Sequence, residues 1–238
     1  MSAGSPPSPP APPSPYSAGL LAAIPRTISN ERLGRYLRAT TQDIPNALKL
    51  YEHNVHLSEA LYGLLHGIEI ATRNSIHVTL TASYGSSNWY DYAPLTPYWQ
   101  RAVQEAKTQA GAGATAGKVI AELTFGFWVE LVKQHNHRTL WVGRKLHRAF
   151  PNARGRTRGY IHDRLKVAQR LRNRISHHER VLTSRNTTYT GFDFLTLAEL
   201  LEIADWVCTE TAGWIRTRFR FAEAQKILAD VSALGFSL

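Results

Sequence analysis

Three polar residues late in the chain, Arg172, Asn173 and His177, have types and spacing that suit phosphodiester chemistry. An arginine guanidinium is a permanent fork of hydrogen-bond donors for phosphate oxygens, and an imidazole can move a proton near neutral pH. Neither group requires a metal ion. A bare Arg-x4-His spacing also arises by chance in a basic chain, so an amphipathic helix with a basic solvent face is the simpler interpretation of the spacing alone.

A helix through this segment would have a polar face and an apolar face. We place Arg172 at 0° around the helix axis and advance by about 100° per residue. On this scale Asn173 and His177 lie between about 100° and 140°. The opposite arc holds Val167, Leu171, Ile175 and Leu182. His178, at about 240°, points into that apolar arc. We therefore predict that His177 shares a face with Arg172, and that His178 is a partly buried, hydrogen-bonded packing residue.

The same segment resembles a known family motif. Arg172-Asn173-x-x-x-His177, followed by His178-Glu179, is similar to the R-N-x-x-x-H motif of the HEPN superfamily. More narrowly it resembles the R-N-x-I-x-H-H-E segment of the Abi-like (abortive infection) branch of bacterial phage-defence proteins. Ser176 departs from this pattern, which has alanine there. Further matching segments, which extend the similarity over roughly residues 28 to 182, are Ala47-Leu48-x-Leu50-Tyr51-Glu52-x-Asn54, Leu65-x-x-Ile68-Glu69-x-x-x-Arg73-Asn74, Leu123-x-Phe125-Gly126-Phe127-Trp128 and Leu140-Trp141.

The resemblance implies an all-α, HEPN-type helical bundle and a metal-independent endoribonuclease toxin that cleaves RNA during phage infection. HEPN ribonucleases are typically dimers with one composite site built from two motif copies. By that resemblance Arg172 would bind the pentavalent phosphate, and His177 would act on the 2′-hydroxyl or the leaving oxygen. Asn173 would orient His177. Supporting roles would belong to Glu69, Arg73, Asn74, His178 and Glu179.

The chemistry of these residues also favours RNA as the substrate. An arginine and an imidazole without a metal cage suit attack by the substrate's own 2′-hydroxyl, which DNA lacks. A catalytically silent RNA-binding or regulatory dimer on the same scaffold is the alternative. A DNA-binding regulator is a third hypothesis, but the chain has no clear recognition helix. The expected partners are RNA, a second copy of the chain, and an antitoxin or a phage trigger.

A long helix should position the supporting residues. Asp43, followed by Pro45, is a good helix start, and helical spacing continues to Tyr84 with Gly85 as the stop. One side of this helix carries a polar stripe made of Tyr62, His66, Glu69, Arg73 and His77. A solvated face with a Glu69–Arg73 pair explains the stripe without function. The family resemblance favours a functional role, because an E-x-x-x-R/K element often accompanies the motif.

Positive charge is concentrated beside the motif. The chain carries a net charge of +10, while residues 138 to 174 contain twelve Lys or Arg and one acid, Asp163. A generic basic surface would account for the charge. Its position next to Arg172 instead favours a track for a phosphate backbone. The residues that we expect to bind RNA are Arg164, Lys166, Arg170 and Arg174.

The remaining sequence predicts flanking helices around the long ones. Residues 1–17 are rich in Pro and Ser and predict a disordered tail, so the helical domain would span residues 18–238. Thr183 to Phe194 should form a loop. We expect a short helix after Ser29 to about Arg38, a helix from Pro97 to Ala110, and an apolar core helix from Lys118 to Gln134. A Thr196-x-x-Glu199 capping box should begin a further helix that runs through Trp214, and a short helix should begin at Phe221.

Several other interpretations are disfavoured by the sequence. Gly111 to Lys118 lacks the spacing of a phosphate-binding loop, since Ala112 stands where its first glycine belongs. The pairs His53/His56 and His135/His137 have no cysteine or carboxylate partner at metal-binding spacing, so we expect no metal and no cofactor. A single cysteine, Cys208, and the lack of an apolar run long enough to span a membrane or of a signal peptide predict a cytoplasmic protein.

Overall fold

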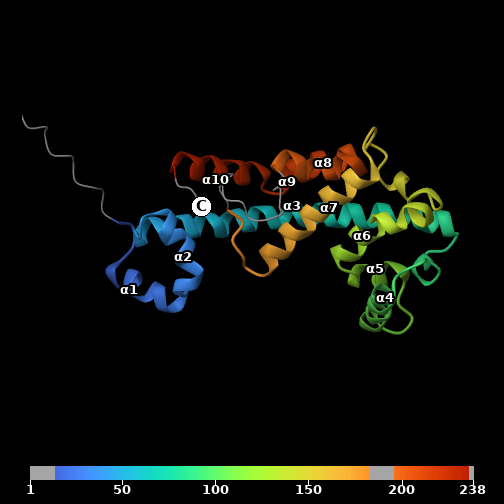
Figure 1. The fold of residues 1–238 in the computed structure, drawn as a ribbon, viewed down its shortest axis with the longest axis horizontal. Helices are drawn as coiled ribbons and strands as arrows, with labels where there is room; N and C mark the ends of the chain where they lie inside the picture. Colours follow the sequence, from blue (N-terminus) through green and yellow to red (C-terminus); the bar gives the residue numbers. More distant parts are fainter. Residues whose placement is uncertain (1–13, 183–195, 236–238) are drawn as a thin grey trace, which may run out of the picture.

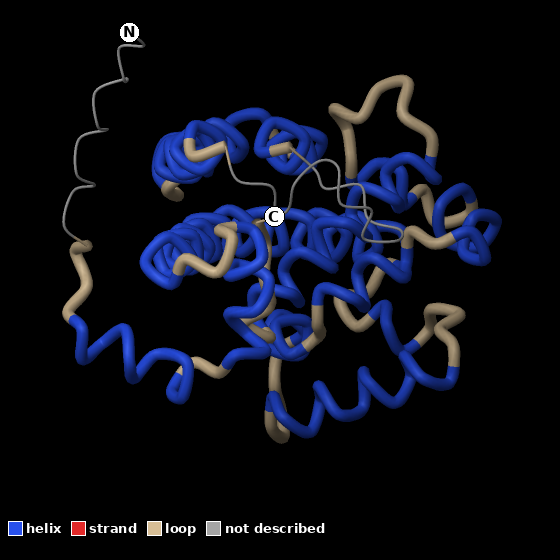
Figure 2. Tube along the Cα trace, turned by 60° about the vertical axis from the view of Figure 1, so that its left-hand side comes forward, coloured by secondary structure: helices blue, strands red, loops and turns tan. Residues whose placement is uncertain are grey.

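The structure, a computed structural model, describes residues 14–182 and 196–235. Within these residues the chain forms helices joined by turns and contains no strand, as Figure 2 shows. The predicted all-α class is therefore confirmed. Most of the predicted tail (residues 1–13) and the predicted loop from Thr183 to Phe194 lie outside the described residues.

The long helix α3 (Ile44–Tyr84) is the axis of the fold, and its bounds match the prediction. The Asp43 side chain accepts a hydrogen bond from the backbone N–H of Asn46, Pro45 lies in the first turn, and Gly85 ends the helix in the left-handed conformation. Its 41 residues span about 60 Å at the usual rise. Its buried residues form one side that other helices can cover, including Leu57, Leu65, Ile68 and Ile76.

The other helices pack along α3 (Figure 1). Helices α2 (Asn30–Ala39) and α10 (Phe221–Ala233) contact it, and both lie toward its N-terminal half in Figure 1. Helices α8 (Leu197–Val207) and α9 (Thr209–Arg218) lie along one side of it, and α7 (Arg158–Ser176) crosses it. Gly67 lets α9 pack closely on α3, because a Cβ at this position would come within 2.9 Å of Ile215.

Two helices predicted as continuous are broken. The core helix expected from Lys118 to Gln134 is divided into α5 (Ala116–Glu122) and α6 (Phe125–Leu131), because Leu123 and Thr124 are extended. The break leaves Phe127 and Trp128 fully buried beside Trp89, with ring centroids 6.2 Å from that indole. Packing of these large rings outweighs the local helical preference.

The second break falls at Cys208, which is extended and separates α8 from α9. The predicted capping box at Thr196 and Glu199 is present at the start of α8. After the break, Trp206 of α8 lies against Tyr160 of α7, while Ile215 of α9 packs on Gly67 of α3. The break thus lets each short helix bury its own side chain against a different neighbour.

The N-terminal region has one helix that the sequence did not predict. Helix α1 (Ala18–Thr27) begins after Ser17, whose side chain accepts a hydrogen bond from the N–H of Leu20. The hydroxyl of Tyr16 donates to Glu52 of α3 at 2.9 Å, so the end of the predicted tail contacts the helical domain. Helices α2 after Ser29, and α4 (Pro97–Ala110), have the predicted positions.

Asn54 links α3 to the segment that follows the motif. The side chain is 6% exposed, and its Oδ1 accepts hydrogen bonds from the backbone N–H groups of Val181 (2.8 Å) and Leu182 (3.1 Å). We predict that Asn54→Ala lowers the free energy of unfolding by about 2–4 kcal/mol, because two buried donors lose their acceptor. Chemical denaturation measures this, with the exposed Asn74→Ala as the control on the same helix. Equal effects of the two substitutions would contradict the prediction.

Candidate functional site

The site is built where α7 crosses α3. Nε of Arg172 lies 3.2 Å from Oε2 of Glu69, and its Nη2 lies 3.5 Å from Oε1, so the guanidinium faces the carboxylate at two points. Both side chains are partly shielded, at 31% and 18% exposure. A charge-assisted pair with this shielding orients the guanidinium more firmly than a solvated pair would. The structure thus brings Glu69 and Arg172 together across 103 residues of chain.

Asn173 contacts Arg172 rather than His177. Its Oδ1 lies 3.4 Å from Nη1 of Arg172, and its backbone carbonyl accepts a hydrogen bond from the N–H of His177 at 2.9 Å. The predicted orientation of the His177 ring by the Asn173 amide is not present in this arrangement. The amide instead helps to hold the guanidinium, and His177 is linked to it through the backbone.

The helix ends before both histidines, which corrects the predicted helical faces. Helix α7 stops at Ser176, His177 is its C-cap, and His178 adopts a left-handed conformation with φ 55°. The N–H of Glu179 donates to the carbonyl of Arg174, and that of His178 donates to Ile175. These two bonds form a Schellman ending, in which the residue at the position of His178 is usually glycine.

Both histidines are therefore exposed. The prediction that His178 is a buried packing residue is wrong, because the angular placement assumed a helix that continues past Ser176. His177 is exposed as expected, but it is displayed by the helix terminus and not by the helix face. An exposed imidazole at the end of α7 is accessible to a substrate.

The supporting residues are only partly gathered at the site. Glu69 pairs with Arg172, so the simple Glu69–Arg73 pair that the sequence allowed is not the arrangement found. Nε of Arg73 donates to Oδ1 of its neighbour Asn74 at 3.2 Å. Glu179 lies 3.5 Å from Arg174, so that the Schellman ending also carries an ion pair.

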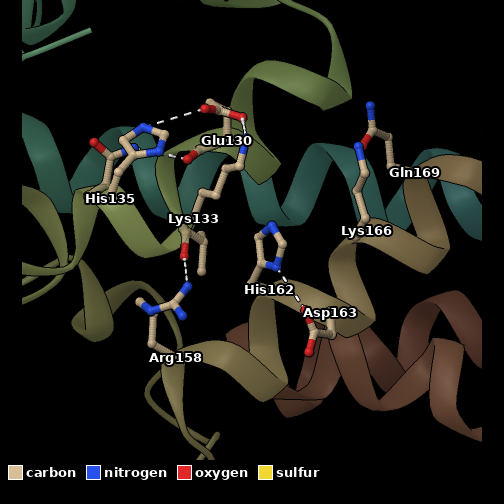
Figure 3. Close-up of polar contacts among 10 residues, drawn as sticks. Glu130, Lys133, His135, Arg158, His162, Asp163, Lys166 and Gln169 are labelled. Atoms are coloured by element: carbon tan, nitrogen blue, oxygen red, sulfur yellow. Dashed lines mark hydrogen bonds and ion pairs between the residues drawn. The ribbon is translucent and has the colours of Figure 1, made fainter. Parts of the chain in front are cut away.

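The four residues predicted to bind RNA differ in their surroundings. Arg164 is engaged by Glu199 of α8, with Nη1 2.6 Å from Oε1, so its charge is already countered within the fold. Lys166 donates to Gln169 at 3.1 Å, as Figure 3 shows. Burial lowers the pKa of Lys166, and the charge of Arg170 lowers it further. Arg170 and Arg174 are half-buried on α7.

Figure 3 shows what supports the N-terminal half of α7. Arg158 donates to the carbonyl of Val132 at 2.6 Å and to the side chain of Gln134. On the same side, Glu130 accepts ion pairs from Lys133 (3.5 Å) and His135 (3.4 Å). The contacts of Arg158 tie the start of α7 to the end of α6, and so fix the direction in which the helix carries Arg172 toward α3.

One residue that the sequence did not single out belongs to the site. Nη1 of Arg32, on α2, donates to the backbone carbonyl of His178. Together with Asn54, it holds the chain immediately after the motif from two sides. Asn54 is part of the family resemblance, so the sequence contained a signal for it. Arg32 is one of many arginines, and only the approach of α2 to this segment identifies it.

An apolar hollow lies apart from Arg172 and His177. A hollow of about 620 Å³ lies between α3, α9 and the turn at Leu146–Ala149, lined largely by apolar side chains such as Ile70, Val78 and Trp214. Neither Arg172 nor His177 lines it. Among the described residues no three His, Cys, Asp or Glu side chains are grouped to hold a metal ion, and no helix there is long and apolar enough to cross a membrane.

No family model, curated protein or solved structure matches this chain. A functional proposal therefore depends on the motif and on the geometry described above.

The Schellman ending makes a specific prediction for His178. Glycine adopts the left-handed conformation freely, so His178→Gly should leave the free energy of unfolding unchanged or raise it by up to about 1 kcal/mol. A β-branched residue is poorly tolerated there, and His178→Val should lower it by about 1–2 kcal/mol. Urea denaturation of both variants provides the measurement. A large loss of stability in His178→Gly would instead support a packing role for the imidazole.

Proposed function

We propose that this protein is a metal-independent endoribonuclease of the HEPN type, acting as a toxin in abortive infection or phage defence. The observation that carries the proposal is the pairing of Arg172 with Glu69, which presents an oriented guanidinium one turn before the exposed His177. The resemblance of this segment to the HEPN motif supports the same assignment. Phosphate recognition and proton transfer would then occur at the end of one rigid helix.

The contacts of Arg172 leave it able to bind a phosphate. Its Nε and Nη2 face Glu69, and Nη1 lies near Asn173, but a guanidinium carries five N–H donors. The remaining donors can contact non-bridging oxygens, which gain negative charge in the transition state. The role of Glu69 and Asn173 is to fix the plane of the guanidinium. Such orientation lowers the entropy cost of binding the transition state.

The proposed reaction uses the substrate's own nucleophile. The 2′-hydroxyl gives its proton to a base, its oxygen bonds to phosphorus, and the bond from phosphorus to the 5′-oxygen breaks. The leaving oxygen takes up a proton, so the products are a 2′,3′-cyclic phosphate and a 5′-hydroxyl. The imidazole of His177 can serve as either the base or the acid, since its ordinary pKa lies near neutrality.

A single chain supplies one such histidine, whereas the reaction uses both a base and an acid. We therefore propose a homodimer in which two copies of the motif face each other across a twofold axis, the commonest symmetry of identical chains. The exposed position of His177 at the end of α7 is compatible with this arrangement. An antitoxin or a phage component that blocks or exposes this surface would regulate it.

The basic face of α7 would hold the rest of the RNA. Lys166, Arg170 and Arg174 lie on the half of the helix that turns away from its buried residues, and each is half-buried. Arg172 lies on the side of α7 that faces Glu69 of α3. The pairing with Glu199 gives Arg164 a smaller share in RNA binding than the sequence predicted.

One observation favours a catalytically silent RNA-binding or regulatory dimer as the second candidate. Arg172 is already paired with Glu69, so the guanidinium has a structural partner in the absence of any substrate. A silent protein would bind RNA without cutting it.

The products and the metal dependence of the reaction can be measured directly. Purified protein should cleave RNA in EDTA and leave a 2′,3′-cyclic phosphate or its hydrolysis product, and a 2′-deoxy nucleotide at the cut site should block cleavage there. Arg172→Ala or His177→Ala should reduce the rate at least about a hundredfold, with little change in melting temperature for His177→Ala. Strict dependence on an added divalent metal would contradict the mechanism. Binding without cleavage would favour the silent dimer.

A composite site requires that both chains of a dimer contribute to one reaction. Mixing the native chain with an excess of the His177→Ala chain produces heterodimers that hold one imidazole instead of two. Because one of the two proton-transfer groups is then missing, the cleavage rate per native chain should fall at least about tenfold, and gel filtration should show a dimer. Full activity from a strictly monomeric protein would rule out the composite site, and an unmixed His177→Ala homodimer is the matched control.

A further inference from the structure

Arg180, three residues after His177, has an unusual environment. Its side chain is half-buried, and Nη1 and Nη2 are shielded from solvent with no hydrogen-bond acceptor. A shielded cationic group without an acceptor costs free energy, because the solvation that it loses is not replaced. The mechanism proposed above does not use this residue. Among the residues that the structure describes, no acceptor faces these two nitrogens, so an anionic group from outside the chain would suit them.

The charges that surround Arg180 are mainly of its own sign. Burial lowers the pKa of Arg180, and the positive charges of Arg35, Arg174 and Arg38 lower it further. Arg35 and Arg38 come from α2, whereas Arg174 comes from α7. The nearby acid Glu179 is exposed and pairs with Arg174. Two helices and the segment after the motif thus bring like charges together.

The backbone around Arg180 is held firmly. Arg32 donates to the carbonyl of His178, two residues before it, and Asn54 accepts from the N–H groups of Val181 and Leu182, directly after it. These contacts fix the backbone from which the Arg180 side chain extends toward α2. Arg38 is exposed at the edge of the cluster, so an anion can approach from solvent along α2.

We propose that Arg180, with Arg35 and Arg38, forms a binding site for a phosphate group of an RNA backbone, next to the scissile phosphate at Arg172 and His177. This proposal rests on the proposed function and adds a subsite to it. Guanidinium groups match the oxygens of a phosphate through paired hydrogen bonds. The chain's net charge of +10, and the basic face of α7 that leads to the cluster, favour a polyanion over an isolated acidic group. The site would hold the strand on the α2 side of the cut.

The test measures binding without cleavage. A fluorescent single-stranded oligonucleotide with 2′-deoxy nucleotides throughout is titrated with the full-length protein over a series of salt concentrations. We expect Arg180→Gln to weaken binding at least about tenfold and to reduce the slope of log K against log salt by about one, the loss of one phosphate contact. Arg180→Lys keeps the positive charge but loses the paired donors of the guanidinium, so its affinity for the oligonucleotide should lie between those of the native protein and Arg180→Gln.

Arg101→Gln is the matched control, since it removes the same charge from an exposed position on α4, at the far side of the molecule from α2 (Figure 1). It should change affinity by less than about twofold. Arg180→Gln should keep or raise the melting temperature, because it removes an uncompensated cation. Equal affinities of Arg180→Gln and the native protein, with both variants folded, would overturn the proposal.

Two further arms identify the source of the anion. Inorganic phosphate should raise the melting temperature of the native protein more than chloride at equal ionic strength, and Arg180→Gln should lose this gain. If binding of phosphate or of an acidic peptide of glutamate residues requires Arg180, while binding of the oligonucleotide does not, the assignment of the site to RNA is wrong. If the protein cleaves RNA but its affinity for the oligonucleotide does not depend on Arg180, the proposed subsite is wrong and the proposed ribonuclease activity stands. Arg180-dependent binding without any cleavage supports the subsite and refutes the ribonuclease.

Discussion

The ion pair between Arg172 and Glu69 is the contact on which the rest of the site depends. It joins α7 to α3 at the point where the two helices cross, and it sets the direction of the guanidinium. The long α3, begun by Asp43 and ended by Gly85, provides a rigid base for the carboxylate. The contacts of Arg158 with the end of α6 fix the other end of α7. A substrate would therefore meet an arginine whose position is determined by three elements of the fold.

The chain after α7 is as important as the helix itself. The Schellman ending turns the backbone at His178, and Arg32 and Asn54 then hold residues 178 to 182 between α2 and α3. This path exposes His177 and carries Arg180 back toward the arginines of α2. An exposed imidazole, an oriented guanidinium and a cluster of arginines thus lie within a few residues of one another. These are the elements that binding and cleavage of a phosphodiester chain use.

Much of the fold could be predicted from local signals. Capping residues at Ser29, Asp43 and Thr196 marked helix starts correctly, since a cap acts through its own first turn. The helix breaks at Leu123 and Cys208 could not be predicted from the sequence. They are determined by the burial of aromatic and aliphatic side chains against helices that are distant in the chain. In the site, the motif singled out Arg172 and a separate polar stripe singled out Glu69, but only the fold shows that these two residues pair. The end of α7 at Ser176 was missed, since histidine in a left-handed cap has no strong sequence signal, and His178 was misplaced as a result.

Exchanging the charges of the central ion pair separates its structural role from its chemical one. Glu69→Arg and Arg172→Glu should each lower the melting temperature and abolish RNA cleavage, because each leaves a partly buried charge beside a like charge. The chain with both substitutions restores an ion pair with reversed polarity, so it should regain most of the melting temperature while remaining inactive toward RNA. Cleavage by the doubly substituted chain at the native rate would contradict the assignment of Arg172 to the phosphate. Full activity of the Arg172→Glu chain would do so as well.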